Sequence, residues 1–486
     1  MYTRRGVILG SASLALAGCG GGGSSPAPPI AGPSPPPPPP PAPPPPPPPP
    51  AGPGPGDTYR NEIIGYGLLQ SDPAGIFDLP ADFSYRVIAR SGDKMDDGFL
   101  VPTSLDGMGA IDLGGGQVAL VRNHELSPGA HSSGPTGGSA QLAAAIGARA
   151  YDRQQGLPHP GGATTTVYDY RSQRVVSSYL SLAGTVRNCA GGVTPWGSWL
   201  SCEESLHQGD LPHGWVFEVP GQSNGLADPV PLRALGRFNH EAALVDPASG
   251  IVYLTEDRED ALFYRLLPAS PGKLAAGGRL QALGFADGSA DTRNWNGTDF
   301  AEGAWRGGRW IDLDGVDSAI DDLRLRGRSK GAAVFARGEG IHLGTGELYF
   351  TCTSGGAARL GQVMRYAPSP QEGQPGEAAQ PGRLQLFRES HDAKLFSFAD
   401  NLAVAPWSHL ILCEDKAEQN PVNHLKGVSP EGRVYTIGRN AHPALGELAG
   451  VCFSPDGATL FLNIYSPGIT LAVTGPWHKL SSVPIA

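Results

Sequence analysis

The sequence predicts an all-β fold, a β-propeller with a few short helices in inserted loops. Glycine is abundant, with 69 residues, and amphipathic helical periodicity is scarce. The best helix candidates are residues 141–151 and, more weakly, 317–325. The rest of residues 57–486 consists of short apolar runs bounded by turn residues, and one hairpin unit recurs at intervals of roughly 50 to 100 residues. Such repetition favours a propeller, in which each blade packs on its neighbours; a β-sandwich is the alternative.

The repeated unit begins with a turn residue, continues as an apolar strand and ends in small polar and acidic residues. Its copies are residues 196–205 (WGSWLSCEES), 250–259 (GIVYLTEDRE), 346–354 (GELYFTCTS), 407–416 (WSHLILCEDK) and 456–466 (DGATLFLNIYS). A second strand-like segment follows most copies, at residues 214–219, 262–267, 361–367 and 432–437. The inner strand of a propeller blade ends beside the central channel, so we expect the polar ends to converge on one site.

The first 56 residues predict export and attachment. Paired arginines at positions 4 and 5 precede a short uncharged stretch, which indicates a twin-arginine-type signal peptide over residues 1–18; an ordinary secretory signal is the alternative. Small residues before Cys19 resemble a lipobox, so Cys19 is the expected lipid-attachment residue unless a plain cleavage site lies there. Residues 19–56 are rich in proline and predict a disordered stalk. We expect an exported lipoprotein, periplasmic or at the cell surface, that contacts the membrane only through its N-terminal lipid.

Residues 57–486 are expected to form the folded domain, and their charge limits the possible partners. Loss of the two signal-peptide arginines moves the formal net charge from −10 to −12, and no basic cluster is present. Nucleic acid is therefore not expected as a partner. An acidic protein that binds an anionic substrate needs local positive charge, for which bound cations are the obvious source. Five cysteines remain beyond Cys19, so at least one thiol must be inert in a core, reactive or a metal ligand.

Acidic pairs follow three copies of the repeated strand. Like charges this close repel strongly unless they extend into water or cations neutralise them. Several such pairs at one place in a repeat favour a metal site over solvated turns, and oxygen ligands suit Ca²⁺, Mg²⁺ or Fe³⁺. The candidate pairs are Glu203 with Glu204, Glu256 with Asp257, and Glu414 with Asp415.

The tripeptide Asn-His-Glu occurs twice, at residues 123–125 and 239–241. Alternate residues of a strand point the same way, so Asn123 and Glu125 could bind one ion while His124 faces elsewhere. A strand end with a core histidine is the alternative for either copy.

Two further segments could carry chemistry. Cys189 lies in a small-residue stretch (NCAGG) that lets the backbone approach a ligand, although a buried inert thiol is the alternative. Arg337 and Glu339 lie on one side of an extended stretch. A metal-bound Glu339 beside Arg337 would form an anion clamp, because a guanidinium matches phosphate oxygens; a surface ion pair is the alternative.

Between residues 65 and 477 runs the ordered series NHE, NCAGGVTPWGSWLSCEE, GRFNHEAA, YLTEDR, FARGEG, DNLAVAP and ELAGVCFSPDGATLFLNIYSPG. This series resembles the PhoX family of exported alkaline phosphatases. The resemblance implies a six-bladed propeller whose channel holds Fe³⁺ and Ca²⁺, with Arg337 binding the substrate phosphate. The metal ligands that it implies are Cys189, Glu241, Glu339, Glu125, Glu204, Asp400 and Glu447.

These observations favour a metal-dependent phosphomonoesterase that acts on a small-molecule phosphate ester as a monomer. One alternative is a calcium-dependent propeller hydrolase of lactones or phosphodiesters. The other is a non-enzymatic propeller that binds a ligand at the cell surface.

Overall fold

The structure is a computed structural model that describes residues 58–415 and 421–480. These residues belong to one compact unit, Pro49–Ala486. The expected signal peptide (residues 1–18), the lipid-attachment residue Cys19 and the expected stalk (19–56) lie outside the described residues. Within the described ranges, no helix has the length and apolarity needed to cross a bilayer.

The fold is all-β with two short α-helices, and most strands belong to large antiparallel sheets. One four-stranded sheet contains β4 (Leu105–Gly114), β5 (Gln117–His124), β8 (Gly161–Asp169) and β9 (Arg174–Thr185). A three-stranded sheet contains β10 (Asn188–Val193), β11 (Ser198–Glu203) and β12 (Val216–Pro220). Another four-stranded sheet contains β26 (Leu448–Phe453), β27 (Thr459–Ile464), β28 (Ile469–Thr474) and β3 (Ser84–Arg90).

The remaining strands form a nine-stranded, a six-stranded and a two-stranded sheet. In order, the nine are β13 (His240–Val245), β14 (Val252–Glu256), β15 (Tyr264–Pro268), β16 (Gly278–Phe285), β17 (Trp305–Asp312), β21 (Arg383–Glu389), β20 (Gln362–Ala367), β19 (Leu348–Cys352) and β18 (Gly338–Leu343). The six are β1 (Leu69–Gln70), β2 (Phe77–Pro80), β25 (Val434–Asn440), β24 (His424–Val428), β23 (Leu410–Glu414) and β22 (Ala399–Val404). A small hairpin pairs β6 (Arg153–Gln154) with β7 (Leu157–Pro158).

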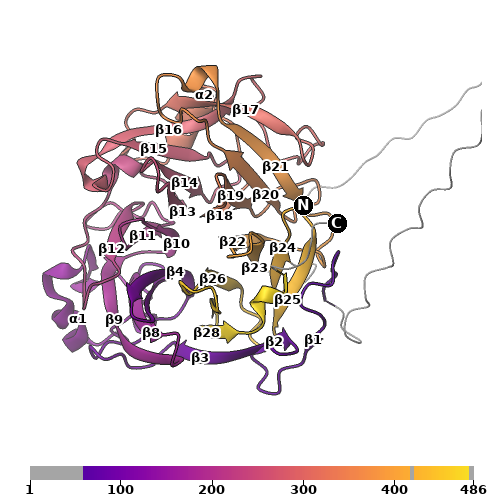
Figure 1. The fold of residues 1–486 in the computed structure, drawn as a ribbon. Helices are drawn as coiled ribbons and strands as arrows, with labels where there is room; N and C mark the ends of the chain where they lie inside the picture. Colours follow the sequence, from indigo (N-terminus) through magenta and orange to yellow (C-terminus); the bar gives the residue numbers. More distant parts are fainter. Residues whose placement is uncertain (1–57, 416–420, 481–486) are drawn as a thin grey trace, which may run out of the picture. The chain divides into compact units, whose positions relative to one another are not determined.

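The sheets surround a central channel in a propeller-like arrangement. Their innermost strands, here called the inner strands, pack one against the next in a closed ring in the order β4, β10, β13, β18, β22 and β26 (Figure 1). The propeller-like arrangement that the sequence predicts is therefore confirmed. The hydrogen-bonded sheets do not separate into six, because β17 joins β16 to β21 and because β1 and β2 extend the sheet beyond β25. Such additions cover sheet edges that would otherwise be open to aggregation.

Distant parts of the chain close the ring. Strand β3, near the start of the described residues, pairs antiparallel with β28, from Ser84 opposite Thr474 to Arg90 opposite Ile469. Apolar side chains fill the space between neighbouring sheets. For example, the rings of Phe461 in β27 and Tyr168 in β8 meet edge to face, with their centroids 5.4 Å apart. Closure by strands from both ends ties the inner strands into one cooperative unit.

The repeated segments of the sequence form the second strand of each unit, not the inner strand. They correspond to β11, β14, β19, β23 and β27, and an inner strand precedes each of them. The expectation that they are inner strands is therefore wrong. The inner strands line a narrow channel and are rich in glycine and alanine, as in β10 (NCAGGV), so they lack the strong apolar alternation of a typical strand.

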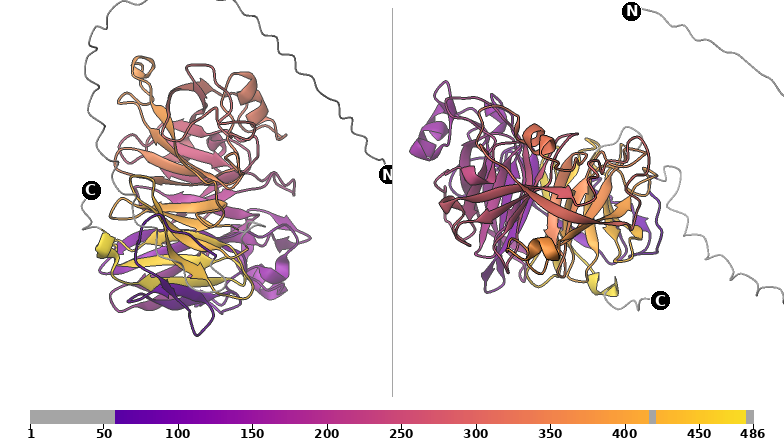
Figure 2. Two further views of the ribbon diagram at one scale, coloured as in Figure 1. Left: turned by 90° about the vertical axis from the view of Figure 1, so that its right-hand side faces the viewer. Right: turned by 90° about the horizontal axis from the view of Figure 1, so that it is seen from above.

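The two helices are shorter than predicted and lie in inserted loops at the outer edge (Figures 1 and 2). Helix α1 (Ala140–Ile146) begins after Ser139, whose Oγ accepts from the backbone N–H of Leu142, and ends at Gly147 with φ of 59°. The predicted helix over 141–151 therefore extends too far. Helix α2 (Leu323–Ser329) begins later than the predicted 317–325, because residues 317–322 form turns.

Candidate metal centre

Every inner strand contains a β-bulge at the same level of the channel. In β10, Asn188 lies opposite Glu203 of β11 and Gly191 lies opposite Ser201. The chain therefore advances three residues in β10 while it advances two in β11. The same shift occurs in the other inner strands, between Leu105/Met108, His240/Ala243, Gly338/Ile341, Ala399/Leu402 and Ala449/Cys452. A bulge adds one residue and redirects its side chain. The first bulged residues, here called the bulge ring, are Asp106, Cys189, Glu241, Glu339, Asp400 and Gly450.

The bulge ring brings metal-binding side chains together. Ligand atoms lie within 4.8 Å of one another in three groups of the channel, two of which share Glu241. The groups are Cys189–Glu204–Glu241, Glu241–Glu339–Asp400 and Asp106–Glu125–Glu447. Seven of these eight residues are those that the family resemblance implies. The exception is Asp106, which the sequence does not predict because no motif surrounds it. Only its register position in β4 places it with the others.

The two members of each acidic pair have different roles. The first member lies opposite the first residue of an inner strand in the β-ladder, and its carboxylate accepts hydrogen bonds from a nearby loop. Glu203 accepts from the backbone N–H groups of Val186 and Gly214, and Glu256 from Leu262 N–H. Both were predicted as metal ligands, but the structure uses their carboxylates to fix loops. The second members, Glu204 and Asp257, lie in the channel, because consecutive residues of a strand point in opposite directions.

The Asn-His-Glu motif is split in the same way. The amide of Asn123 donates to the carbonyl oxygens of Cys189 (3.2 Å) and Ala190 (2.7 Å), and its oxygen accepts from Ser201 Oγ at 2.8 Å. Asn123 therefore fixes the bulge that carries Cys189, and the expectation that it shares an ion with Glu125 is wrong. Glu125 lies in the channel, where Tyr465 Oη donates to its Oε2 at 2.9 Å.

Two arginines contact the channel carboxylates. Arg337 donates from Nε to Asp257 Oδ1 (2.7 Å) and from Nη2 to Glu339 Oε1 (3.1 Å). Nη2 of Arg187 lies 2.5 Å from Glu125 Oε1 and also forms an ion pair with the carboxylate of Glu204. Each arginine directly precedes an inner strand and has a left-handed backbone, with φ of 54° for Arg337 and 44° for Arg187. The sequence predicts a role for Arg337 but not for Arg187, because only the fold shows that the two arginines occupy equivalent positions before their inner strands.

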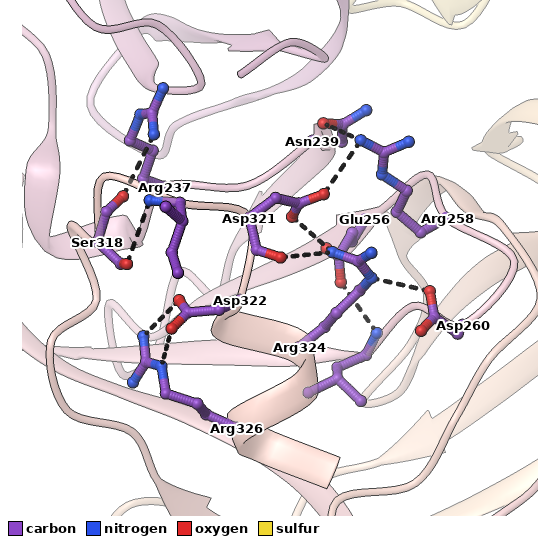
Figure 3. A network of polar contacts seen from close by, with 12 residues as sticks. Arg237, Asn239, Glu256, Arg258, Asp260, Ser318, Asp321, Asp322, Arg324 and Arg326 are labelled. Carbon is purple, nitrogen blue, oxygen red and sulfur yellow. Dashed lines mark hydrogen bonds and ion pairs between the residues drawn. The ribbon is translucent and has the colours of Figure 1, made fainter.

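A third arginine connects the channel rim to the α2 loop. Arg258 follows Asp257 and donates from Nη2 to Asn239 Oδ1 (3.2 Å) and Asp321 Oδ2 (3.3 Å). Asp321 also binds Arg324, whose Nε donates to Asp260. Figure 3 shows this network of alternating charges, which holds the loop before α2 against the rim.

The channel carboxyl groups are too close and too buried to ionise together without added positive charge. Burial, followed by repulsion from neighbouring carboxylates, raises the pKa values of Asp106, Glu241, Glu339 and Glu447 well above their ordinary range. The same causes raise the pKa of Asp400 to about 7 and that of Glu204 to about 8. Burial and the nearby Glu241 also raise the pKa of the Cys189 thiol. Bound cations would reverse these shifts, so this donor set of carboxylates and one thiol suits metal ions.

Beyond the bulge ring, the inner strands line an apolar continuation of the channel. It is a cavity of about 500 Å³ lined mainly by small and aliphatic residues such as Ala190, Ala242, Leu402 and Val451. The backbones approach closely: a Cβ atom on Gly192 would lie 1.8 Å from the carbonyl oxygen of Ala243. The metal-binding side chains are thus confined to one level of the channel.

The five cysteines of the described chain are all unpaired. Cys189 is the only one of them that belongs to a channel group. The other four are Cys202, Cys352, Cys413 and Cys452, and the first three are fully buried in apolar surroundings. The odd thiol count that the sequence indicates is therefore met by one candidate ligand, three core residues and Cys452, which is half-buried and lines the apolar cavity.

Fold and site together define a propeller-like protein whose channel is lined by potential metal ligands. Residues 64–468 match the family model for alkaline phosphatase PhoX. The chain belongs to the PhoX alkaline phosphatase family, which places it among the phosphoric monoester hydrolases.

One solved structure supports the fold. PhoX of Pseudomonas fluorescens, in complex with the transition-state analogue vanadate, is 19% identical with a TM-score of 0.60; the match covers 86% of this chain and 97% of that one. A gluconolactonase of Xanthomonas campestris is 15% identical with a TM-score of 0.39, over 82% of this chain and 97% of that one. No curated protein matches the chain.

Proposed function

We propose that the chain is an exported, metal-dependent phosphomonoesterase that holds calcium and iron ions in its central channel. The observation that carries the proposal is the bulge ring, because five of its six residues bear a carboxylate or a thiol and each of the five belongs to a group of close potential metal ligands. Family membership supports the reaction.

The donor types support the choice of ions. Cys189 is the single soft ligand, and a thiolate favours iron over calcium. Glu241 belongs to both groups that contain ring glutamates, so its carboxylate would be a ligand available to either. The carboxylates of Asp106, Glu125 and Glu447 form a group of oxygen ligands alone, which suits calcium. When bound, the cations would supply Lewis-acid stabilisation of charge that develops on the phosphoryl oxygens.

The arginines at the channel would recognise the phosphate. Arg337 presents a planar guanidinium that its two bonds to Asp257 hold in one orientation, and the Gly-Glu-Gly sequence after it keeps the approach open. Arg187 approaches from the strand pair β10–β11, so a phosphate ester could receive charge-assisted hydrogen bonds from both. This electrostatic positioning accounts for much of the rate of phosphoryl transfer.

The proposal also includes the number of propeller blades and the location of the protein in the cell. Six inner strands with equivalent bulges support a six-bladed propeller, two of whose sheets are fused through β17. The sequence of residues 1–56 supports export through the twin-arginine route, attachment through Cys19 and a proline-rich stalk. The chain would act as a monomer on a small phosphate ester outside the cytoplasm.

The test combines metal analysis with turnover of p-nitrophenyl phosphate by the domain purified without its signal. We expect iron and calcium in the wild type, with loss of iron and turnover in Cys189→Ala. Cys352→Ala is the matched control, because Cys352 is equally buried but lies outside the channel groups. Calcium alone without turnover would contradict the phosphatase proposal and favour a calcium-dependent hydrolase of another ester or a binding propeller.

A further inference from the structure

A second group of potential metal ligands lies outside the channel. It consists of Asp152, His159 and His213, whose ligand atoms lie within 4.8 Å of one another. All three are buried, with relative exposures of 4%, 1% and 0%. Asp152 and His159 flank the β6–β7 hairpin, and His213 ends the loop that follows Glu204. The group therefore connects two inserted segments that are distant in sequence.

His159 is the observation that points to a missing ligand. Neither of its ring nitrogens has a hydrogen-bond partner among the residues that the structure describes, although the ring is buried. Burial disfavours the charged form of an imidazole, so a ring in this position has a nitrogen lone pair available to a ligand. A buried imidazole without a partner is costly unless something binds it.

The separations match a tetrahedral metal site. Nε2 of His213 lies 3.2 Å from Asp152 Oδ2, and Nε2 of His159 lies 3.6 Å from the same oxygen. Bonds of about 2.0–2.2 Å to zinc place two tetrahedral ligands about 3.3–3.6 Å apart. One ion between the three atoms would thus need little movement of the side chains.

The surroundings are also those of a metal site. Nδ1 of His213 lies 2.6 Å from Glu203 Oε1, so the ring can donate to a carboxylate while Nε2 faces the group, as metal-binding histidines commonly do. His207 packs against both rings, with centroids 5.2 Å from His159 and 5.6 Å from His213, on the more exposed side. Gly209 closes the loop over the group, since a Cβ there would lie 2.2 Å from Asp152 Oδ2.

We propose that Asp152, His159 and His213 bind one zinc ion, with His207 as the fourth ligand, at a structural site separate from the phosphatase channel. Two or three imidazoles with one carboxylate suit zinc. The ion would fasten the β6–β7 hairpin to the loop 204–213. Because Glu203 orients His213 and precedes Glu204, the site would also fix the end of β11 beside the channel.

The test measures zinc per chain, by mass spectrometry of the purified mature protein after zinc loading and removal of excess metal. We expect one equivalent to be lost in His159→Ala and kept in His391→Ala, whose ring is exposed. The channel variant Glu339→Gln should keep it too, which separates this site from the phosphatase metals. Titration with zinc should show at least about 100-fold weaker binding for His159→Ala and about 10- to 100-fold weaker binding for Glu203→Gln.

A second readout makes the test independent of folding defects. Cobalt substituted for zinc should give the visible absorption of a tetrahedral site in the wild type and in Glu339→Gln, but not in His159→Ala or Asp152→Asn. Circular dichroism verifies that each variant is folded. Equal zinc content in folded wild type and His159→Ala, or no tetrahedral cobalt spectrum in the wild type, would overturn the proposal.

Discussion

Removal of the channel cations should make the stability of the protein strongly dependent on pH. Asp400 and Glu204 have pKa values of about 7 and about 8 in the metal-free fold, above their ordinary values of 3.8 and 4.5. Burial is the largest cause for both, and Asp415 and Asp257 add repulsion. A raised pKa means that the folded state binds more protons than the unfolded state. The contribution of these two groups to the free energy of unfolding is therefore largest below about pH 4, and it falls as the pH rises to about 8.

The expected magnitude follows from these values. Each group that is protonated in the folded state and ionised in the unfolded state changes the free energy of unfolding by about 1.4 kcal/mol per pH unit. Asp400 alone, with its pKa moved from 3.8 to about 7, would cost about 4 kcal/mol above pH 7. The neighbouring groups share protons, so we expect one to two such contributions. Bound cations favour the ionised carboxylates and should remove the dependence.

The assay is urea unfolding of chelator-treated and metal-loaded protein at intervals from pH 5 to pH 8. The metal-free wild type should lose about 3 to 6 kcal/mol across this range, and the loaded protein should lose little. Asp400→Asn should flatten the metal-free curve, whereas Asp317→Asn, which removes an exposed carboxylate, should leave it unchanged. A metal-free wild type equally stable at pH 5 and pH 8 would refute the clustering of these carboxyl groups.

Three further predictions follow from other features. Gly192→Ala should destabilise the fold by about 3 kcal/mol or more because its Cβ would overlap the Ala243 carbonyl, whereas Gly225→Ala, with open space around it, should change the melting temperature little. Arg187→Ala should lower kcat/KM for p-nitrophenyl phosphate about 10- to 100-fold through loss of a charge-assisted bond, and the exposed Arg60→Ala serves as control. Lysines in place of the arginines at positions 4 and 5 should stop export, as cell fractionation would show; unchanged export would indicate an ordinary secretory signal.

The sequence predicts the type of site better than it predicts the geometry of the site. The acidic pairs do mark the level of the channel, because they end strands that lie beside it. Glu204 and Asp257 lie in the channel, whereas Glu203 and Glu256 accept hydrogen bonds from loops, since the direction of a side chain depends on strand register. Bulges leave no pattern in composition, so the position of Asp106 opposite the others could not be predicted from its neighbours.

The inner strands show why the fold itself was harder to predict in detail. Segments such as NCAGGV and GEGIHL are stable as strands only because neighbouring inner strands approach closely, and this tertiary packing overrides weak local propensity. The histidine group was missed for a related reason. Asp152 and His213 are 61 positions apart, and only the insertion of the β6–β7 hairpin brings them together.

The bulge ring explains how one repeated unit produces a site that is not symmetric. Each inner strand supplies one position, yet at β26 that position is Gly450, where a Cβ would lie 2.6 Å from both Asn463 Nδ2 and the carbonyl oxygen of Asp106. The carboxylate on this side comes instead from Glu447, in the turn before β26. Cys189 breaks the symmetry again by placing one thiol among carboxylates. A common backbone feature thus fixes where the potential ligands lie, and the residue type at each position determines which donor atom that part of the channel offers.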